Sequence, residues 1–458
     1  MVAGAFFMEN LDGTIIATAA PRMARSFGVP SVELNVVITA YLLALGVFIP
    51  VSGWIADRFG ARVVFSGAIA LFTVASGLCA LSTSLGELTL TRVLQGIGGA
   101  MMVPVGRLVV LRAASKADII RVIAYLTWPA LVAPVIAPAL GGAIVTYTSW
   151  RWIFVLNLPL GVVALVVAAR IVPDLRAERV QRLDWRGFAL TGLGLATFVY
   201  GLELVTQGSV SWDAVAAAVG AGLMLICWAV FHLLRSANPL LDLRVLKVAS
   251  FRAANLGGSL FRIAISAVPF LLPLLFQNAF GWSPFKSGML VIAIFLGNIA
   301  IKPMTTTILR RFAFRTVLMC SAGAAGATLA LCAGFSARTP LVLIVVVLVA
   351  SGVFRSVGFT AYNTIVFADV TPDAMNNANT LFSTVQQLTM GLGVAVGALA
   401  LRAGAPLDRF FGVSGTGARP FGAAFLLLGV VALLAAAEAG LLPPQAGSAI
   451  ASRKLGVT

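Results

Sequence analysis

The sequence Gly53-Trp-Ile-Ala-Asp-Arg-Phe-Gly-Ala-Arg62 separates two apolar runs, at about residues 34–56 and 63–83. Each run is long enough to cross a bilayer as a helix, which takes about 20 apolar residues. The link carries three charged side chains within a few positions: Asp57, Arg58 and Arg62. Because charges are costly in the hydrocarbon region, the link is expected at a membrane surface, with the two helices as antiparallel neighbours.

The composition of the whole chain agrees with this interpretation. Of the 458 residues, 60% are hydrophobic and only 10% are charged, and the mean hydropathy is +1.01. Soluble domains carry about 25% charged residues. Apolar runs recur from end to end, and no stretch is long and polar enough for a soluble domain, which indicates a polytopic helical membrane protein.

Several functional classes are excluded by what the sequence lacks. The net charge of +16 comes with no basic run that has interleaved aromatic residues, so we expect no nucleic-acid partner. His232 is the only histidine, which leaves no His-based metal site or catalytic triad. The cysteines lie in apolar runs without metal-ligand spacing: Cys79, Cys227, Cys320 and Cys332. No phosphate-binding loop is present. The sequence therefore predicts no metal, no cofactor and no enzymatic activity.

Apolar runs predict an all-α integral membrane fold with fourteen transmembrane helices. They lie near residues 2–20, 34–56, 63–83, 87–111, 119–146, 152–172, 187–206, 213–234, 253–279, 287–309, 316–335, 340–367, 378–401 and 419–442. The longest polar links, 173–186 and 235–252, bracket the seventh and eighth helices. The predicted domains are an N-terminal six-helix bundle at 1–172, a linker with two additional helices at 173–250, a C-terminal six-helix bundle at 251–442 and a cytoplasmic tail at 443–458.

A repeat supports the division into two six-helix halves. The R-F-x-x-R pattern of Arg58–Arg62 recurs at Arg311–Arg315, in both cases between the second and third helices of a half. Two similar halves that face each other are typical of secondary transporters, whose binding site lies between them near the bilayer midplane. The second copy has Arg310 where the first has Asp57.

The distribution of basic residues predicts the orientation. Nineteen of the 32 lysines and arginines fall in links on the side of Gly53–Arg62, and eight fall on the other side. The basic side should be cytoplasmic, and an even number of helices places both termini there. The link around 368–377 is an exception, since it has two aspartates and no cation.

Charged side chains within the apolar runs are the candidate functional residues. They comprise five cations and at least three carboxylates: Arg92, Arg107, Arg262, Lys302, Arg355, Glu9, Asp12 and Glu203. Each costs about 2.5–3.5 kcal/mol at a helix centre, so each needs a partner, a water-filled cavity or a nearby interface.

Glu9 and Asp12 are three residues apart and share one helix face. Two carboxylates at a low-dielectric cavity raise each other's proton affinity, which makes this pair a candidate for proton coupling. The alternative is that an arginine from another helix holds Asp12 ionised. Arg92 is the candidate partner, and it forms one polar stripe with Gln95 and Gly99.

The fifth predicted helix combines prolines with a glycine pair. Pro129, Pro134 and Pro138 predict kinks, and Gly141-Gly142 permits close helix packing. A bent packing helix and a rocking hinge are both compatible with this pattern.

These motifs together resemble those of the major facilitator superfamily. Gly53-x-x-x-Asp57-Arg58-x-Gly60-x-Arg62 resembles its loop 2–3 signature, Arg92-x-x-Gln95-Gly96-x-Gly98-Gly99 its fourth-helix motif, and Pro138-x-x-Gly141-Gly142 its antiporter motif. Leu11-Asp12-x-Thr14-Ile15 and Trp150-Arg-Trp-Ile-Phe-x-x-Asn157-x-Pro159 are similar to the fourteen-helix drug:proton antiporter branch of the EmrB/QacA type. Phe276-Gln277, Ser283-Pro284-Phe285 and Gln386-Gln387-Leu388 are similar to its MdtD-type members.

The resemblance implies proton-driven export by alternating access across the inner membrane. It assigns Asp12 and Arg92 to proton coupling, with Glu9 as a further candidate. A cytoplasmic gate is implied at Gly53, Asp57, Arg58, Gly60 and Arg62. The chain departs from the family pattern at Ala137, where the antiporter motif has glycine, and at Arg310, where the second loop motif has an acidic residue.

The substrate stays open between two chemical classes. The family favours small hydrophobic drugs, whereas cations outnumber carboxylates within the membrane, which favours a small organic anion such as a citrate-like acid. The candidate cavity residues are Gln95, Arg262, Lys302 and Arg355. A passive facilitator of the same fold is a further alternative. The expected partners are a small-molecule substrate, protons and the lipid bilayer; a monomer suffices, and accessory export proteins are compatible with this function.

Overall fold

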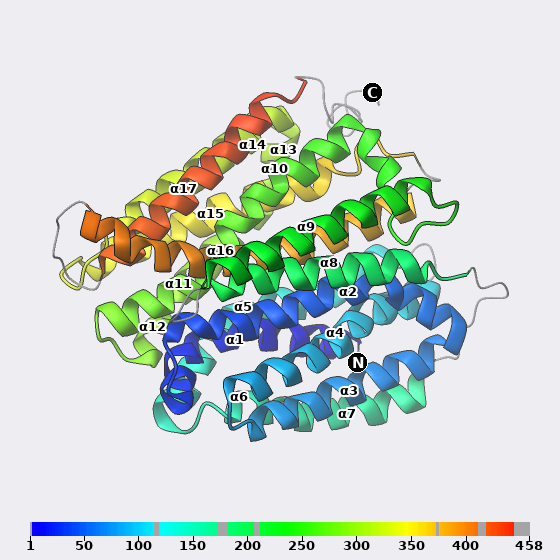
Figure 1. Ribbon diagram of the computed structural model, residues 1–458, viewed down its shortest axis with the longest axis horizontal. Helices are drawn as coiled ribbons and strands as arrows, with labels where there is room; N and C mark the ends of the chain where they lie inside the picture. The colour runs from blue at the N-terminus through cyan, green and yellow to red at the C-terminus, as the bar shows by residue number, and fades with distance from the viewer. Residues whose placement is uncertain are drawn as a thin grey trace. The chain divides into compact units, whose positions relative to one another are not determined.

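The computed structural model describes residues 2–113, 119–172, 182–205, 211–371, 375–410 and 418–443, and all regular structure in them is helical. The chain divides into two compact units (Figure 1). Unit 1 comprises Met1–Leu241 with Ser283–Gly288, and unit 2 comprises Asp242–Trp282 with Met289–Thr458.

Twelve helices in the described residues are long and apolar enough to cross a membrane, whereas the sequence predicted fourteen. The two predicted helices missing from this set are α1 (Val2–Phe27) and α5 (Ile119–Tyr147). In α1, polar residues such as Glu9 and Asp12 interrupt the apolar run. In α5, most side chains before Val135 lie outside the described residues. The described part is therefore a shorter apolar helix, Val135–Tyr147.

Within the described residues, unit 1 contains the helices α1 to α9 with the short η1, and α8 and α9 are the two that follow the sequence's first long link. Beyond α1 and α5 they are η1 (Ser31–Leu34), α2 (Asn35–Phe59), α3 (Ala61–Leu81), α4 (Leu85–Ala113), α6 (Trp152–Val155), α7 (Asn157–Ile171), α8 (Trp185–Leu204) and α9 (Trp212–Arg235).

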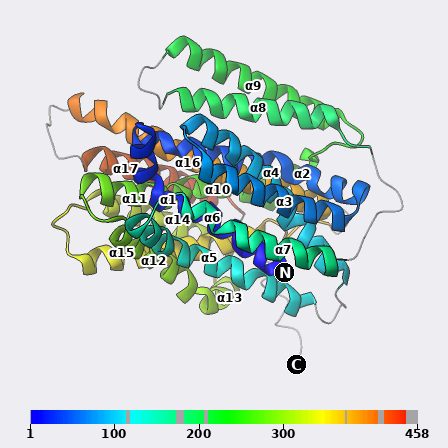
Figure 2. The same ribbon diagram turned by 90° about the horizontal axis from the view of Figure 1, so that it is seen from below.

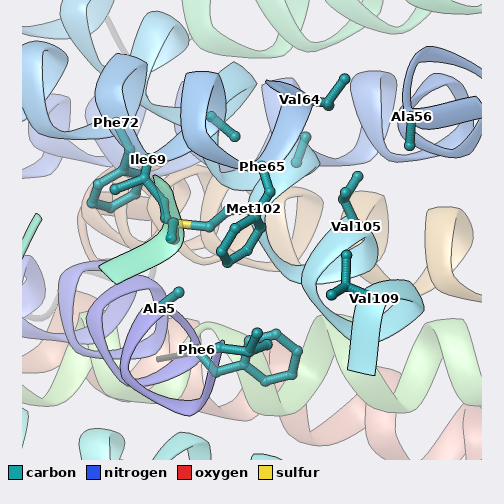
Figure 3. Close-up of a cluster of buried hydrophobic side chains, with 14 of the residues drawn as sticks. Ala5, Phe6, Ala56, Val64, Phe65, Ile69, Phe72, Met102, Val105 and Val109 are labelled. Atoms are coloured by element: carbon teal, nitrogen blue, oxygen red, sulfur yellow. The ribbon is translucent and has the colours of Figure 1, made fainter. Parts of the chain in front are cut away.

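The core of unit 1 forms where α1, α2, α3, α4 and α7 meet (Figure 3). Phe65 and Phe72 of α3 are fully buried there. Since lipid is as apolar as these side chains, close packing rather than hydrophobicity holds such helices together. Glycines in α4 allow it: a methyl group at Gly96 would stand 2.7 Å from the carbonyl oxygen of Tyr41 in α2, and one at Gly98 would stand 2.8 Å from the amide nitrogen of Phe72.

A single residue, Gly60, joins α2 to α3. Its φ of +93° lies in a region that residues with a side chain rarely adopt, and its amide donates a 2.9 Å hydrogen bond to the carbonyl of Ala56. In unit 2 the equivalent junction is Ala313, the residue before α14, and its φ is an ordinary −59°. The sequence repeat is therefore not a repeat of backbone conformation, because only the first copy has glycine at this position.

The helices α8 and α9 form an antiparallel hairpin that lies along α2 (Figure 2). Aromatic pairs connect α8 to α2, with ring centroids 6.0 Å apart for Trp54 and Trp185 and 5.4 Å apart for Phe48 and Phe188. At the other end of α8, Asn35 Nδ2 donates a 2.9 Å hydrogen bond to Oε2 of the buried Glu203. This contact gives the intramembrane Glu203 a polar partner.

Asp184 closes the base of the α8–α9 hairpin. It caps the N-terminus of α8 by accepting a 2.8 Å hydrogen bond from the Gly187 amide, and it accepts a second from the Leu240 amide at 3.3 Å. His232 Nε2 lies 2.8 Å from Asp184 Oδ1. Desolvation alone would raise the pKa of Asp184, but the hydrogen bonds from Gly187, His232 and Leu240 outweigh it and lower that pKa.

Unit 2 contains the remaining helices, apart from the first turn of α12. They are η2 (Leu243–Lys247), α10 (Ala249–Ser266), α11 (Val268–Leu274), the π-helical η3 (Leu275–Ala279), α12 (Pro284–Ala300), α13 (Lys302–Arg311), α14 (Phe314–Ala333), α15 (Leu341–Ile365), α16 (Met375–Phe410) and α17 (Arg419–Gly440).

Two helices predicted as continuous are broken in unit 2. The predicted helix at 253–279 is divided into α10, α11 and η3, and the one at 287–309 into α12 and α13. Pro269 and Pro303 each lie at the start of the segment after a break. Proline has no amide hydrogen to continue the ladder and disfavours helical geometry in the residue before it, which explains both interruptions.

Candidate functional site

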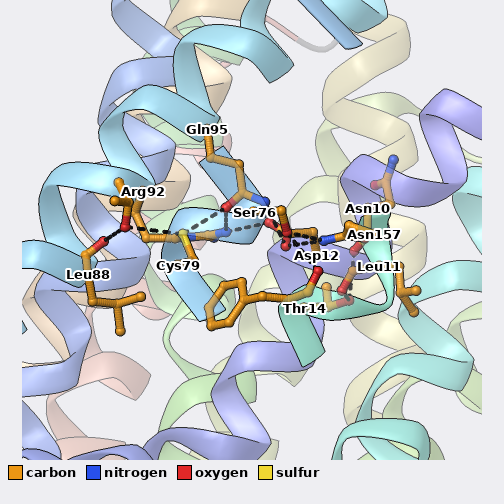
Figure 4. Close-up of polar contacts among 12 residues, drawn as sticks. Asn10, Leu11, Asp12, Thr14, Ser76, Cys79, Leu88, Arg92, Gln95 and Asn157 are labelled. Atoms are coloured by element: carbon orange, nitrogen blue, oxygen red, sulfur yellow. Dashed lines mark hydrogen bonds and ion pairs between the residues drawn. The ribbon is translucent and has the colours of Figure 1, made fainter. Parts of the chain in front are cut away.

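The candidate site of unit 1 is a buried polar network around Asp12 of α1 (Figure 4). Asp12 Oδ2 forms an ion pair with Arg92 Nη1 of α4. Asp12 Oδ1 accepts hydrogen bonds from Gln95 Nε2 at 3.1 Å and from Asn157 Nδ2 at 2.9 Å. None of these four side chains is more than 1% exposed. Three donors therefore surround the carboxylate away from solvent.

Arg92 is held between the carboxylate and an aromatic ring. Its Nη1 also donates to Gln95 Oε1 at 2.5 Å, and its guanidinium carbon lies 4.0 Å from the centroid of the Tyr41 ring. Its Nε and Nη2 atoms are buried and donate to no side chain or carbonyl among the described residues. A buried guanidinium with two unused donors depends strongly on its single carboxylate partner.

Asn157 and Ser76 are members of the network that sequence reasoning did not assign to the site. Asn157 opens α7, and its Nδ2 bridges Asp12 and Ser76 Oγ, which is 3.0 Å away. Ser76 of α3 in turn donates to the carbonyl of Phe154 at 3.0 Å. The only signal for Asn157 was its place in the Trp150–Pro159 motif, and no signal distinguished Ser76 from an ordinary small residue of a packed helix.

This network can link proton binding to movement of helices. Protonation of Asp12 would remove the negative charge that stabilises Arg92, and an unpaired buried charge costs several kcal/mol. The helices α1, α4 and α7 contribute the three principal side chains. A proton on Asp12 would therefore favour a different arrangement of these helices, with Arg92 bound to another partner or to water.

The other residues predicted around Asp12 lie close to this network. Glu9 is partly buried one turn earlier on α1, with its carboxyl carbon 3.7 Å from the methyl position of Gly99 on α4. Gln95, predicted as a cavity residue, belongs to the ion-pair network instead. Asp12 thus has the arginine partner that sequence analysis considered as the alternative to a carboxylate pair.

The predicted gate residues lie at the junction of α2 and α3. Arg58 and Arg62 are exposed, Asp57 is partly buried, and Gly53 lies exposed nearly two turns before the end of α2. Arg62 donates to the carbonyl of Ala169, near the end of α7, so the junction also contacts the last helix of the predicted N-terminal bundle. Cations near a helix C-terminus are favourable because they complement its partial negative charge.

The predicted antiporter helix makes close backbone contacts at its glycines. A methyl group at Gly141 would stand 2.9 Å from the carbonyl oxygen of Ile15 in α1. One at Gly142 would stand 2.6 Å from the carbonyl oxygen of Pro284, in the 283–288 segment of the same unit. Pro138 is buried one turn earlier. Side chains at 129 and 134 lie outside the described residues, so the predicted kinks there are not described.

The three cations predicted for the cavity lie in unit 2. Arg262 is 1% exposed and donates from Nε to Thr389 Oγ1 at 3.1 Å. Lys302 Nζ donates to Thr360 Oγ1 at 3.0 Å, and Arg355 Nη1 donates to the carbonyl of Ile265 at 3.4 Å. Within the described residues these contacts involve hydroxyl and carbonyl oxygens, and no ion pair joins the three cations to a carboxylate.

Two further predictions concern Arg107 and metal binding. The side chain of Arg107 lies outside the described residues. Among the side chains that are described, no group of three or more His, Cys, Asp or Glu residues could hold a metal ion.

Comparison with known proteins places this geometry in a family. Residues 2–237 and 254–454 match the model of the Major Facilitator Superfamily. The chain is 35% identical over 402 residues to "Putative multidrug resistance protein MdtD" of Salmonella paratyphi A, which covers 88% of this chain and 85% of the relative. The protein of the same name in Salmonella typhimurium is equally similar.

Solved structures of transporters share the fold at low sequence identity. A D-xylose-proton symporter superposes with a TM-score of 0.68 at 12% identity and covers 97% of both chains. A POT family transporter in complex with 5-aminolevulinic acid gives a TM-score of 0.68 at 17% identity, covering 95% of this chain and 94% of that one. The chain is a multi-pass membrane transporter of small molecules and not an enzyme. It belongs to the Major Facilitator Superfamily.

Proposed function

We propose that this protein is a proton-coupled exporter that moves small, mostly hydrophobic molecules out of the cell by alternating access. The observation that carries the proposal is the buried ion pair between Asp12 and Arg92, within a family whose members here bear multidrug-resistance names. Buried intramembrane charges are expensive and typically mark ion or proton pathways. We place the protein in the inner membrane, with both termini cytoplasmic, on the basis of the Lys and Arg distribution.

The fourteen-helix arrangement of the EmrB/QacA branch is part of this proposal. At 26 and 29 residues, α1 and α5 are long enough to span a bilayer, and together with the twelve apolar helices they would make fourteen. The hairpin α8–α9 would be the additional central pair, within a linker at 173–250 between six-helix bundles at 1–172 and 251–442. The proposed cytoplasmic tail, 443–458, lies almost entirely outside the described residues.

In the proposed cycle, Asp12 binds the proton and Arg92 then leaves its ion pair with Asp12. The ionised Asp12 is stabilised by Arg92, Gln95 and Asn157, and its protonation would release Arg92. Asp57, Arg58 and Arg62 would control the cytoplasmic gate at the Gly60 junction, and Gly53 belongs to the same proposed gate. Pro138, Gly141 and Gly142 would let α5 move against its neighbours without losing contact.

An organic-anion exporter is the second candidate, and one observation favours it. Arg262, Lys302 and Arg355 contact neutral oxygen atoms rather than carboxylates within the described part of unit 2. Cations that lack an internal counter-ion are suited to a carboxylate on a substrate, which Arg binds in a bidentate fashion. Under this alternative, a small di- or tricarboxylate would replace the hydrophobic drug.

Reconstituted transport tests both candidates. Purified protein in proteoliposomes would be given a panel of hydrophobic cationic dyes and di- and tricarboxylates, with and without an imposed pH gradient. Proton-coupled export predicts dye transport that depends on the gradient and is lost in Asp12→Asn, while Glu33→Gln, a control on the short η1 turn, transports normally. Transport that ignores the gradient would refute coupling and leave passive facilitation.

Substitution of the cations of unit 2 distinguishes between the two substrate classes. If an organic anion is the substrate, Arg262→Gln or Lys302→Gln should abolish carboxylate transport while the protein still inserts. Wild-type rates in these variants, together with dye transport, would refute the anion alternative.

A further inference from the structure

Glu438 is an intramembrane carboxylate that neither the motifs nor the proposed function uses. It lies on α17, two residues before the helix ends at Gly440. The side chain as a whole is partly exposed, but its Oε2 atom is buried and accepts no hydrogen bond from any group that the structure describes. A buried acceptor without a donor costs about 1–3 kcal/mol, and more when it is charged. The chemical state of this carboxyl group therefore needs an explanation.

The carboxyl group fills the space that a glycine leaves open on α10. A methyl group at Gly257 would overlap Glu438 Oε2 and would stand 3.2 Å from the hydroxyl oxygen of Tyr362. Tyr362 of α15 is 1% exposed, and its hydroxyl is likewise buried without a hydrogen-bond partner among the described residues. Two buried oxygen atoms without hydrogen-bond partners among the described residues, one from α17 and one from α15, thus border the same small space beside α10.

Arg262, which approaches the same stretch of α10, does not neutralise Glu438. Arg262 Nη1 would stand 3.0 Å from a methyl group at Gly258, the next residue, but this atom too has no hydrogen-bond partner within the described set. The same guanidinium donates to Thr389 through Nε and to Ser259 through Nη2 at 3.3 Å. No ion pair joins Arg262 to Glu438 among the described residues, although they approach the same stretch of α10.

The other helices packed on α17 bring no counter-ion to Glu438. On α14, Met319 lies 3.7 Å from the methyl position of Gly440, the last residue of α17. This contact places Arg315 and Cys320 of α14 near the C-terminal end of α17. Arg315 makes no ion pair with Glu438 in the described structure. The sequence of α16 has no charged residue before Arg402. Glu438 is therefore faced by Tyr362 and, at the next residue of α10, by Arg262.

We propose that Glu438 is a proton-binding site of unit 2, which holds a proton on Oε2 while it packs against Gly257 and Tyr362. An ionised carboxylate would leave a negative oxygen buried with no cation to neutralise it, beside only the neutral hydroxyl of Tyr362. A protonated carboxyl group has a hydroxyl that can donate to the Tyr362 oxygen after rotation of the side chains. This hydrogen bond would give both buried oxygen atoms a partner. Loss of the proton would drive the carboxylate toward solvent or toward Arg262, and would loosen the contact of α17 with α10.

This inference deepens the proposed function by adding a second proton-binding carboxylate, in the unit that does not contain Asp12. Its consequence for transport rests on the proposed function, but the bound proton does not. The direct test is pH-difference infrared spectroscopy of the full-length protein in lipid nanodiscs, which records the carbonyl stretch of protonated carboxyl groups without any transport assay.

The expected result is a protonated-carboxyl band at neutral pH that is lost in Glu438→Gln. Glutamine matches the shape of the neutral acid, so this variant should remain folded and monodisperse. The band should also be lost in Gly257→Ala, because the methyl group displaces the carboxyl group into a setting where it ionises. It should persist in Asp12→Asn and in the control Glu33→Gln. An unchanged band in folded Glu438→Gln would overturn the proposal.

The two proposals fail in different ways. If a pH gradient does not drive transport, the proposed coupling fails, yet loss of the band in Glu438→Gln would still establish Glu438 as a proton-binding site. If coupled transport is observed and the band is insensitive to Glu438→Gln, proton coupling stands and the site at Glu438 is refuted.

Discussion

Asn157 donates a 2.9 Å hydrogen bond to Asp12 Oδ1 across 145 residues of sequence, and so connects the start of α7 to the middle of α1. The same amide group also donates to Ser76 of α3, so one side chain links three helices. Since both acceptors are buried, this amide orients the carboxylate that we propose as the proton carrier. Its removal should therefore change proton coupling more than it changes folding.

Replacing Asn157 by Ala tests this role. A hydrogen bond to a charged group contributes about 1.5–3 kcal/mol, and losing one that stabilises the ionised carboxylate makes proton binding easier. We expect the pH at which transport is half-maximal to rise by about 1 unit, since 1.36 kcal/mol corresponds to one pH unit. The measurement is the pH profile of efflux in proteoliposomes. Asn10→Ala is the matched control, because the Asn10 side chain donates to the backbone carbonyl of Phe6 in its own helix.

The ion pair of Asp12 and Arg92 should show strong coupling in a double-mutant cycle. Arg92→Gln leaves a buried carboxylate without its cation and should destabilise the protein by about 3–5 kcal/mol. Adding Asp12→Asn removes the uncompensated charge, so the double variant should recover a large part of this loss. Thermal unfolding in detergent measures the three variants, with the exposed Arg22→Gln as control. Strictly additive effects would contradict a direct interaction.

The sequence predicted part of this site for a physical reason. A charge in an apolar helix requires a partner, and Arg92 was the candidate for Asp12 because it lies in a polar stripe with Gln95. The structure shows this ion pair. Asn157 and Ser76 carry no charge, so their burial costs too little to reveal them in a sequence, and only the fold brings them to Asp12.

The fold, like the site, could be predicted from the sequence only in part. Long apolar runs identified most helices, because spanning length and hydrophobicity are properties of a segment alone. The breaks before Pro269 and Pro303 were missed because an apolar run shows no boundary there, although proline supplies the cause. The contact of Glu438 with Gly257 could not be predicted, since α17 and α10 are far apart in sequence and their packing depends on several small residues at once.

Gly60 should be intolerant of a side chain. Its φ of +93° with ψ of 135° is a backbone region used almost only by glycine, so Gly60→Ala should cost about 1–3 kcal/mol. The expected result is a lower thermal unfolding midpoint together with weaker transport, because α2 and α3 meet at this residue. The reverse change at the equivalent position, Ala313→Gly, introduces no such strain, since φ there is −59°. Equal effects of the two substitutions would mean that the turn conformation has no special role.

Asp184 should make the stability of the α8–α9 hairpin depend on pH. Its hydrogen bonds from Gly187, His232 and Leu240 lower its pKa despite desolvation, whereas an Asp in an unfolded chain has a pKa of about 3.9. A lowered pKa in the folded state contributes stability that is present above the unfolded value and is lost as the pH falls through the folded one. Asp184→Asn keeps a capping side chain but removes the charge, so it should lower the unfolding midpoint at pH 7, because hydrogen bonds to a charged group contribute about 1.5–3 kcal/mol and neutral ones about 0.5–1.5 kcal/mol.

The difference in unfolding midpoint between wild type and Asp184→Asn should begin to shrink as the pH falls below about 4, the pKa of an unfolded Asp. It should vanish only below the lowered pKa of the folded protein, where the folded wild-type carboxylate is protonated as well. Thermal unfolding measured at a series of pH values gives this curve directly. Asp213→Asn, an exposed position in the first turn of α9, serves as the control and should show no such convergence. If the two proteins differed equally at neutral and acidic pH, the carboxylate charge would have no part in closing the hairpin.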